Sequence, residues 1–173
     1  MAMAGALRLQ QASVRKQVQL PPAKLEAFFV AIDPEPAQNP AGDCTALNGF
    51  ESAGLVESTA QKAGIDPNLL QAVVQQESAW RPCAVSPKGA QGLMQLMPAT
   101  AADLGVRDPF NAAENLAGGA ALLKQLMTRY SGDLNRVLGA YNAGPARVDA
   151  APDGIPAIPE TVNYIEKILG KLP

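Results

Sequence analysis

Glu77 is a carboxylate that a helix should turn toward the protein core. Within segment 66–78, the apolar residues Leu70, Val73 and Val74 recur at helical spacing, and Glu77 continues their stripe. Burial disfavours a charged carboxylate and raises its pKa, here from about 4.3 toward roughly 6 to 7. A carboxyl with such a pKa can act as a general acid near neutral pH. The alternative is a Glu at a fraying helix end that points to water.

The ends of this predicted helix support the first interpretation. Asp66 can cap the helix and Pro67 suits its first turn, which places Glu77 near the last turn. The helix dipole is negative there, so it also favours the protonated form.

The composition limits the other chemistry available. Histidine is absent, which excludes Ser–His–Asp and Cys–His nucleophile systems and any imidazole metal site. No glycine-rich phosphate cradle follows a strand, so we expect neither a metal nor an organic cofactor. A net charge of -2 with 17% charged residues gives no footprint for nucleic acid or for an anionic membrane surface.

The two cysteines, Cys44 and Cys83, lack the number and spacing of a metal site. They are either two buried thiols or one disulfide, and we expect the disulfide. It would close a loop of about 40 residues, worth about 4 kcal/mol in the chain-entropy model, and it would imply an oxidising compartment. We therefore expect a periplasmic or extracellular protein, although no signal peptide is visible in residues 1–20 and no apolar run is long enough for a transmembrane helix.

The chain divides into an arm and one domain. Residues 1–43 are rich in Ala, Gln and then Pro, and we expect a partly flexible arm with one short docking helix at 25–32. Residues 44–173 can bury one substantial core.

Helical periodicity and capping signals, with Asn111 and Asp133 as cap residues, predict an all-α fold for this domain. A loop rich in Gly and Pro is expected at 81–95, and Gly144-Pro145 should end the fifth helix. The predicted inner face of the last helix is Val162, Ile165 and Leu169. The helices are expected at 50–63, 67–77, 98–104, 112–130, 134–143 and 160–169.

Four segments together resemble a known family. They are QES at 76–78, GLMQLMPATA at 92–101, AYNAGP at 140–145 and ETVNY at 160–164. In this order and spacing they resemble the catalytic domain of the soluble lytic murein transglycosylases, the Slt-like relatives of goose-type lysozyme. The similarity spans roughly residues 53–172 and leaves the arm without a counterpart.

The resemblance implies a lysozyme-like domain with a glycan-binding cleft. It implies cleavage of the β-1,4 bond between N-acetylmuramic acid and N-acetylglucosamine in peptidoglycan, with Glu77 as acid and base. The partners would be glycan strands and, by analogy only, an envelope-spanning assembly; we expect a monomer. By position, the residues that would line the sugar subsites are Ser86, Gln95, Met97, Tyr141, Asn142 and Tyr164.

A single acid is consistent with this lytic chemistry. Most glycosidases use two carboxylates, and no second candidate is evident, since Asp133 and Glu160 are explained by helix starts. The acetamido group of the sugar can supply the nucleophile, and attack by the C6 hydroxyl would give a 1,6-anhydro product. The alternatives are a goose-type muramidase, a non-catalytic peptidoglycan-binding module and a helical scaffold.

The subsite candidates also have structural interpretations. Gln95 could satisfy loop backbone groups, and Met97 could fill a core gap. Tyr141 lies on an inner stripe, so its buried phenol needs a partner, for which Glu77 is a candidate. Tyr164 falls off the predicted inner face of its helix and is expected to face the cleft.

Two more candidates lie at turns. Asn142 could be an ordinary C-terminal helix residue, although its amide can equally bind an acetamido group. Ser86 could only cap the turn at Pro87, and we assign Ser78 a structural role.

Overall fold

The computed structural model describes residues 44–173, and this part of the chain is helical. The predicted arm and its short helix lie outside the described residues. Within them the only β-type pairings are isolated bridges from Gln91 to Val85 and to Leu96, so the all-α prediction is confirmed. The helices are α3 Gly49–Ala63, α4 Pro67–Glu77, α5 Pro98–Asp103, α6 Ala112–Arg129, α7 Leu134–Ala143, α8 Pro145–Ala150 and α9 Pro159–Leu169.

Side-chain caps begin three of these helices at the predicted residues. Asp66 caps α4 by accepting from the Asn68 amide at 2.7 Å, and Asn111 and Asp133 cap α6 and α7 in the same way. Gly64 ends α3 in the left-handed region at φ +63°, where a glycine has no steric penalty. These caps satisfy backbone groups that a helix leaves unpaired, so local sequence defines these boundaries.

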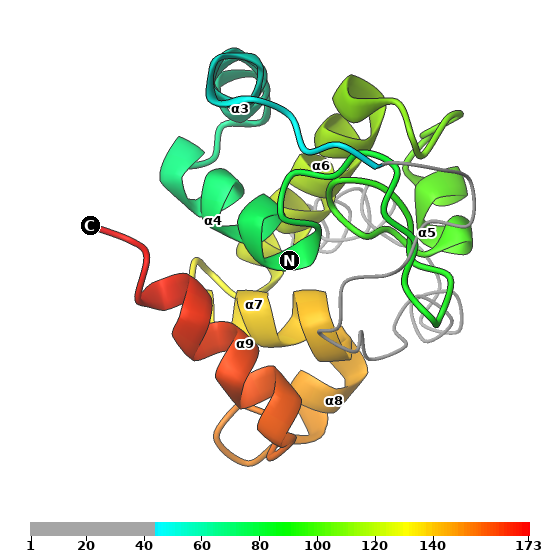
Figure 1. The fold of residues 1–173 in the computed structure, drawn as a ribbon. Coiled ribbons are helices and arrows are strands. Elements are labelled where there is room, and N and C mark those ends of the chain that lie inside the picture. The colour runs from blue at the N-terminus through cyan, green and yellow to red at the C-terminus, as the bar shows by residue number, and fades with distance from the viewer. Residues whose placement is uncertain (1–43) are drawn as a thin grey trace, which may run out of the picture.

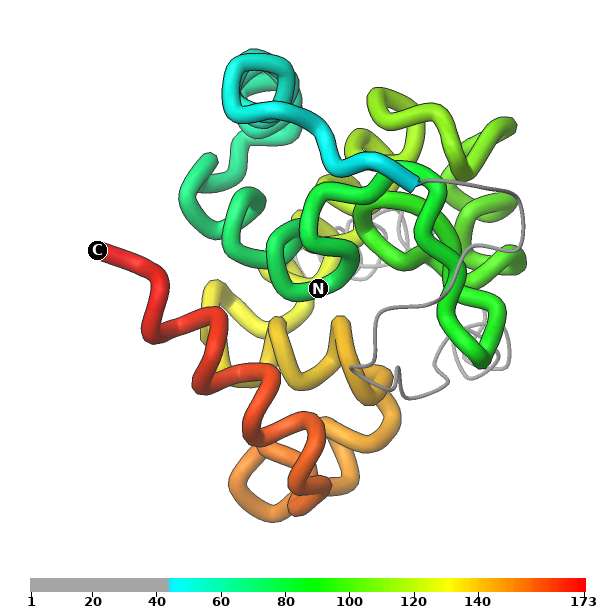
Figure 2. Tube along the Cα trace, viewed as in Figure 1, coloured from blue at the N-terminus to red at the C-terminus, as the bar shows by residue number. Residues whose placement is uncertain are grey.

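The helices form two groups joined through α6 and α7 (Figure 1). The first contains α3 and α4, with α3 packed on α6, and the second contains α7, α8 and α9. Helix α9 also contacts α4, and the hydrogen bond between Tyr164 and Glu77 lies at the last residue of α4, so the two groups meet there. Figure 2 shows the course of the chain through both groups. None of the helices in residues 44–173 combines the length and hydropathy needed to cross a bilayer. The fully buried core includes Leu70, Val73, Leu116, Leu123, Leu138 and Ile168.

Two features differ from the prediction. Helix α8 was not expected; it begins directly at Pro145 because Gly144, at φ +97°, turns the chain out of α7. The inner face of α9 was predicted wrongly, since Val162 and Leu169 are only partly buried. Its buried residues are Thr161, Tyr164, Ile165 and Ile168. Contact with both α4 and α7 decides this face, and it brings two hydroxyl groups inward.

Candidate active site

Glu77 is the last residue of α4, and the chain turns sharply after it. Ala79 and Trp80 both adopt positive φ, at +48° and +67°, which ends the helix within two residues of the carboxyl. Ser78 is buried and donates to the Val74 carbonyl at 3.4 Å, in keeping with a structural role. Glu77 itself is partly buried and directed toward α9.

The carboxyl of Glu77 is held by Tyr164 on α9. The phenol donates a hydrogen bond of 2.5 Å to Glu77 Oε1. Burial raises the pKa of Glu77 to about 8; the Tyr164 hydrogen bond lowers it and the negative charge of Glu160 raises it further. The direction agrees with the expectation of roughly 6 to 7, and the rise is larger because loss of water outweighs the phenol bond.

Tyr141 on α7 does not use Glu77 as its hydrogen-bond partner, which corrects the prediction. Its phenol donates to the Met94 carbonyl at 2.8 Å and so ties α7 to the loop before α5. Burial, and then the charge of Glu77, raise the pKa of this phenol well above its ordinary value. Burial also raises the pKa of Tyr164 well above its ordinary value, so both phenols remain protonated near neutral pH.

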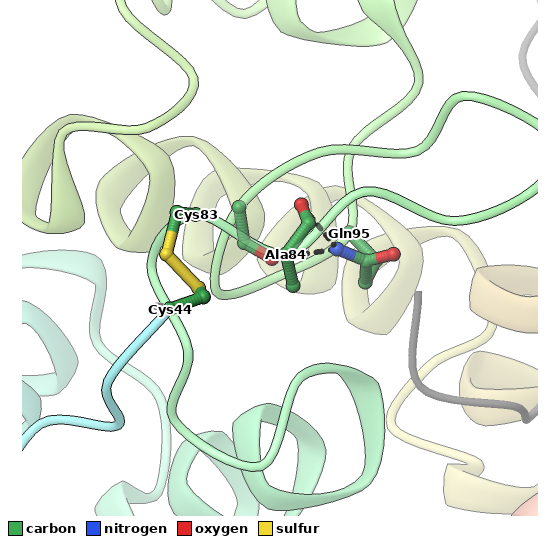
Figure 3. The surroundings of a disulfide bond; sticks show 5 residues. Cys44, Cys83, Ala84 and Gln95 are labelled. Carbon is green, nitrogen blue, oxygen red and sulfur yellow. Dashed lines mark hydrogen bonds between the residues drawn. A yellow bond between two sulfur atoms is a disulfide. The ribbon is translucent and has the colours of Figure 1, made fainter. Parts of the chain in front are cut away.

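The loop before α5 is held by its own polar side chains. Ser86 Oγ accepts from the Ala90 amide at 2.9 Å. Gln95, at φ +47°, donates through Nε2 to the carbonyls of Ala84 at 3.2 Å and Gly92 at 2.8 Å (Figure 3). The side-chain nitrogen of Gln95 thus satisfies loop backbone groups, as one of the two interpretations predicted. Its Oε1 atom has no hydrogen-bond partner among residues 44–173.

The predicted disulfide between Cys44 and Cys83 is present, with the Cα atoms 5.7 Å apart. It lies beside Ala84 and Gln95 (Figure 3). A backbone hydrogen bond of 3.0 Å from Leu47 to the Trp80 carbonyl lies close to it in sequence. Together they attach the segment before α3 to the turn that follows Glu77.

Sequence reasoning missed Asn115 on α6, which is fully buried. Its Oδ1 accepts from the Met94 amide at 2.7 Å, and its Nδ2 donates to the Gln91 and Pro109 carbonyls, both at 2.9 Å. A signal was available: Gly118 and Gly119 follow Asn115 on the same helix face. A Cβ at Gly119 would meet Met94 at 2.5 Å, so this face must fit closely against the loop.

Asn142 and Thr161 form a second buried pair between α7 and α9. Thr161 Oγ1 donates to Asn142 Oδ1 at 2.7 Å. Both residues are buried, since Thr161 is 0% exposed and Asn142 is 3% exposed. Thr161 was not predicted as a site residue. Met97 was also predicted to line a subsite. It is partly buried and occupies the N-cap position, immediately before α5 begins at Pro98.

These features define a class of site. A helical domain here holds one partly buried carboxyl whose raised pKa keeps it largely protonated near neutral pH. The phenol of Tyr164 donates to this carboxyl, and the phenol of Tyr141 lies close enough for the charge of Glu77 to raise its pKa. No three acidic or cysteine side chains of residues 44–173 gather as metal ligands would. The site is therefore that of a helical domain built around a carboxyl that is able to act as a general acid near neutral pH.

The comparisons with known proteins identify the family. Residues 54–153 match the family described as Transglycosylase SLT domain, so the chain belongs to that family. A transglycosylase of Enterobacteria phage PRD1 is 46% identical over 99 residues, covering 57% of this chain and 36% of that protein. Membrane-bound lytic murein transglycosylase F of Yersinia enterocolitica is 42% identical over 86 residues, covering 46% of this chain and 18% of that protein.

Solved structures give the same assignment. Lytic transglycosylase Slt from Pseudomonas aeruginosa is similar with a TM-score of 0.60 and 28% identity, over 68% of this chain and 22% of that one. The soluble lytic transglycosylase Slt70 from Escherichia coli gives 0.61 and 26%, over 68% and 23%. The predicted resemblance and the lysozyme-like fold are confirmed. The chain spans well under half the length of each of these relatives.

Proposed function

We propose that this protein is a lytic transglycosylase that cleaves the β-1,4 bond between N-acetylmuramic acid and N-acetylglucosamine in peptidoglycan and leaves 1,6-anhydromuramoyl ends. The observation that carries the proposal is Glu77, whose pKa of about 8 keeps the carboxyl protonated at neutral pH. The names of the relatives support the same activity.

In the first step Glu77 donates its proton to the glycosidic oxygen as the bond from that oxygen to the anomeric carbon breaks. Tyr164 occupies Oε1, and Oε2 has no hydrogen-bond partner among the described residues, so Oε2 is the atom that transfers the proton. The acetamido oxygen of the same sugar attacks the anomeric carbon, which removes the need for a second protein carboxylate.

In the second step the Glu77 carboxylate accepts the proton of the C6 hydroxyl. The C6 oxygen then attacks the anomeric carbon, displaces the acetamido oxygen and closes the 1,6-anhydro ring. This attack is intramolecular and is therefore favoured over attack by water. Glu77 ends the cycle protonated, as it began.

We propose that the six subsite candidates contribute in two ways. Gln95 Oε1 and Asn142 Nδ2 are polar atoms without a partner in the described residues and can contact sugar. Tyr141 and Ser86 act through the loop that they hold, Met97 offers a partly exposed thioether, and Tyr164 orients the acid.

Glycan strands are the proposed substrate and partner, and an envelope-spanning assembly is a further candidate. The disulfide suits an oxidising compartment, so we place the activity outside the cytosol. We also propose that the chain is a monomer and that it divides into an arm of residues 1–43 and a transglycosylase domain of residues 44–173.

The test is digestion of purified sacculi, with products identified by mass spectrometry. The wild-type chain should release anhydro-ended muropeptides, and Glu77→Gln should lower the rate about 100-fold or more. Glu57→Gln, at an exposed position on α3, is the matched control and should retain activity. Reducing muramic ends would instead identify a goose-type muramidase, and glycan binding without any product would identify a non-catalytic module.

A further inference from the structure

Helix α9 packs against both α7 and α4 (Figure 1), and it presents one hydroxyl group to each of them. Tyr164 donates to Glu77 at the end of α4, and Thr161, one turn earlier, donates to Asn142 at the end of α7. Residues three apart lie on the same side of a helix, so a single element positions both polar groups. The Tyr164 contact orients the proposed acid Glu77, whereas the Thr161 contact takes no part in the two steps of the proposed reaction.

We propose that Thr161 is a specificity-determining positioning residue: it fixes the amide of Asn142 so that only its N–H groups face the ligand, which favours N-acetylated sugars over free-amine sugars. The inference rests on the proposed function, because it assigns Asn142 to a sugar subsite. It adds a residue and a chemical selectivity that the activity alone does not specify.

The orientation of the amide carries the argument. Asn142 Oδ1 accepts the Thr161 hydroxyl at 2.7 Å, and both residues are buried. Asn142 Nδ2 has no partner within residues 44–173, yet it is not one of the enclosed, unpaired polar atoms of that part of the chain. Nδ2 therefore keeps contact with solvent, and the accessible edge of this side chain is a hydrogen-bond donor.

Such an edge distinguishes two kinds of amino sugar. An acetamido group offers a carbonyl oxygen, which accepts from Nδ2. A protonated amine is a donor only, so it meets Nδ2 hydrogen to hydrogen and leaves both groups without a partner. Without Thr161, the Asn142 amide can turn its oxygen outward, and the selectivity falls.

The experiment measures binding by calorimetry in the Glu77→Gln background, which prevents turnover. The two ligands are a tetramer of N-acetylglucosamine and the same tetramer without its acetyl groups. Thr161→Val should weaken binding of the acetylated ligand about fivefold to tenfold, the scale of one hydrogen bond, and should strengthen binding of the deacetylated ligand, because the freed amide can turn its oxygen toward the amine. Thr161→Ser should restore the wild-type ratio, because it retains the hydroxyl.

Two further variants sharpen the test. Asn142→Asp keeps an oxygen for Thr161 but offers a carboxylate oxygen outward, so the preference should invert toward the amine sugar. Thr100→Val is the matched control, since Thr100 Oγ1 is buried without a hydrogen-bond partner and its loss should leave both affinities unchanged. Thermal midpoints measured alongside show whether each variant is folded.

An unchanged affinity ratio in folded Thr161→Val, or no rescue by Thr161→Ser, overturns the inference. Absence of binding to the acetylated tetramer by the parent chain also overturns it. Failure of the proposed activity looks different: no anhydro product from wild type, with the Thr161-dependent ratio still present, supports this inference while rejecting the reaction.

Discussion

The loop before α5 and the helix ends that meet α9 use their polar side chains in opposite ways. At the loop, Ser86 and Gln95, together with Asn115 from α6, form hydrogen bonds with backbone groups. At the helix ends, Glu77 and Asn142 each accept one hydrogen bond from a hydroxyl group of α9. Each of these two side chains has a second polar atom that has no partner among the described residues. Most polar groups of the loop thus maintain its shape, although Gln95 Oε1 stays available to a ligand, whereas both side chains at the helix ends retain hydrogen-bonding capacity for one.

This difference separates the expected effects of substitution. Changes in the loop should lower the free energy of unfolding and leave the titration of Glu77 in place. Changes at the α9 contacts should move a pKa or a ligand preference and alter stability less.

The largest effect should follow removal of the disulfide. Replacing Cys44 and Cys83 together with serine should lower the free energy of unfolding by about 4 kcal/mol, because the unfolded chain is no longer constrained by a closed loop. Urea denaturation measures this loss. A shift in the pH dependence of cleavage in the still-folded variant would contradict the purely structural role given to this region.

Asn115→Leu should destabilise the protein by about 3 kcal/mol. It leaves the Met94 amide and two carbonyls buried without partners, and each unpaired group costs about 1 kcal/mol or more. Asn115→Asp retains the acceptor for Met94 but turns its second oxygen toward the Gln91 and Pro109 carbonyls, so its loss of stability should grow as rising pH ionises this buried carboxyl. Urea denaturation measures both losses, and a loss below about 1 kcal/mol for Asn115→Leu would show that these hydrogen bonds are not what holds the loop.

Glu77→Gln should raise stability, and by more at pH 8 than at pH 5. The pKa of Glu77 is about 8 in the folded protein against 4.5 for an ordinary Glu, so across that window the folded state holds a proton that the unfolded state releases. Stability of the wild type therefore falls as pH rises from 5 to 8, whereas glutamine does not titrate.

We expect a gain of roughly 1 to 3 kcal/mol at pH 8, below the full linkage value because Glu77 is only partly buried. Urea denaturation at the two pH values measures it, with Glu57→Gln as the control that should show no such difference. A gain that is the same at both pH values would mean that Glu77 is already ionised at pH 5.

The smallest effect concerns the Tyr164 contact. The rate of cleavage should fall as pH rises through about 8, since the general acid must be protonated. The phenol bond lowers the pKa of Glu77, so Tyr164→Phe should move this limb to higher pH, by about one unit. The pH profile of kcat/KM measures this shift, and Thr161→Val, the control, should leave the fall of the rate at the same pH. A shift to lower pH for Tyr164→Phe would contradict the assignment of Tyr164 as the group that lowers the pKa of Glu77.

The predictable part of the fold depended on neighbouring residues. Asp66 and Asn111 cap helices through amides two or three residues away, so a short stretch of sequence was sufficient. Helix α8 was missed because Gly144-Pro145 predicts an end to α7 equally well whether a loop or another helix follows. The inner face of α9 was wrong because α4 and α7, distant in sequence, determine which side is covered.

The same separation applies to the candidate site. Glu77 was found because its helical stripe is local, and burial then raised its pKa in the expected direction. The hydrogen-bond partner of Tyr141 was predicted wrongly because the Met94 carbonyl that it binds lies 47 residues earlier in the chain. Asn115 and Thr161 were missed for the same reason, since Met94 lies 21 residues from Asn115 and Asn142 lies 19 residues from Thr161. Such pairings require the packed positions of several helices.

The amino-acid sequence by itself determined an all-helical domain, the ends of most of its helices, the pairing of its two cysteines and the carboxyl suited to acid catalysis. These follow from periodicity, capping and composition, which act over a few residues or over the whole chain. Only the tertiary structure decided that Tyr164 holds the acid, that Thr161 orients Asn142 and that Tyr141 serves the loop. The physical reason is that a hydrogen bond needs its two atoms within about 3 Å, a condition that the packing of α4, α7 and α9 creates.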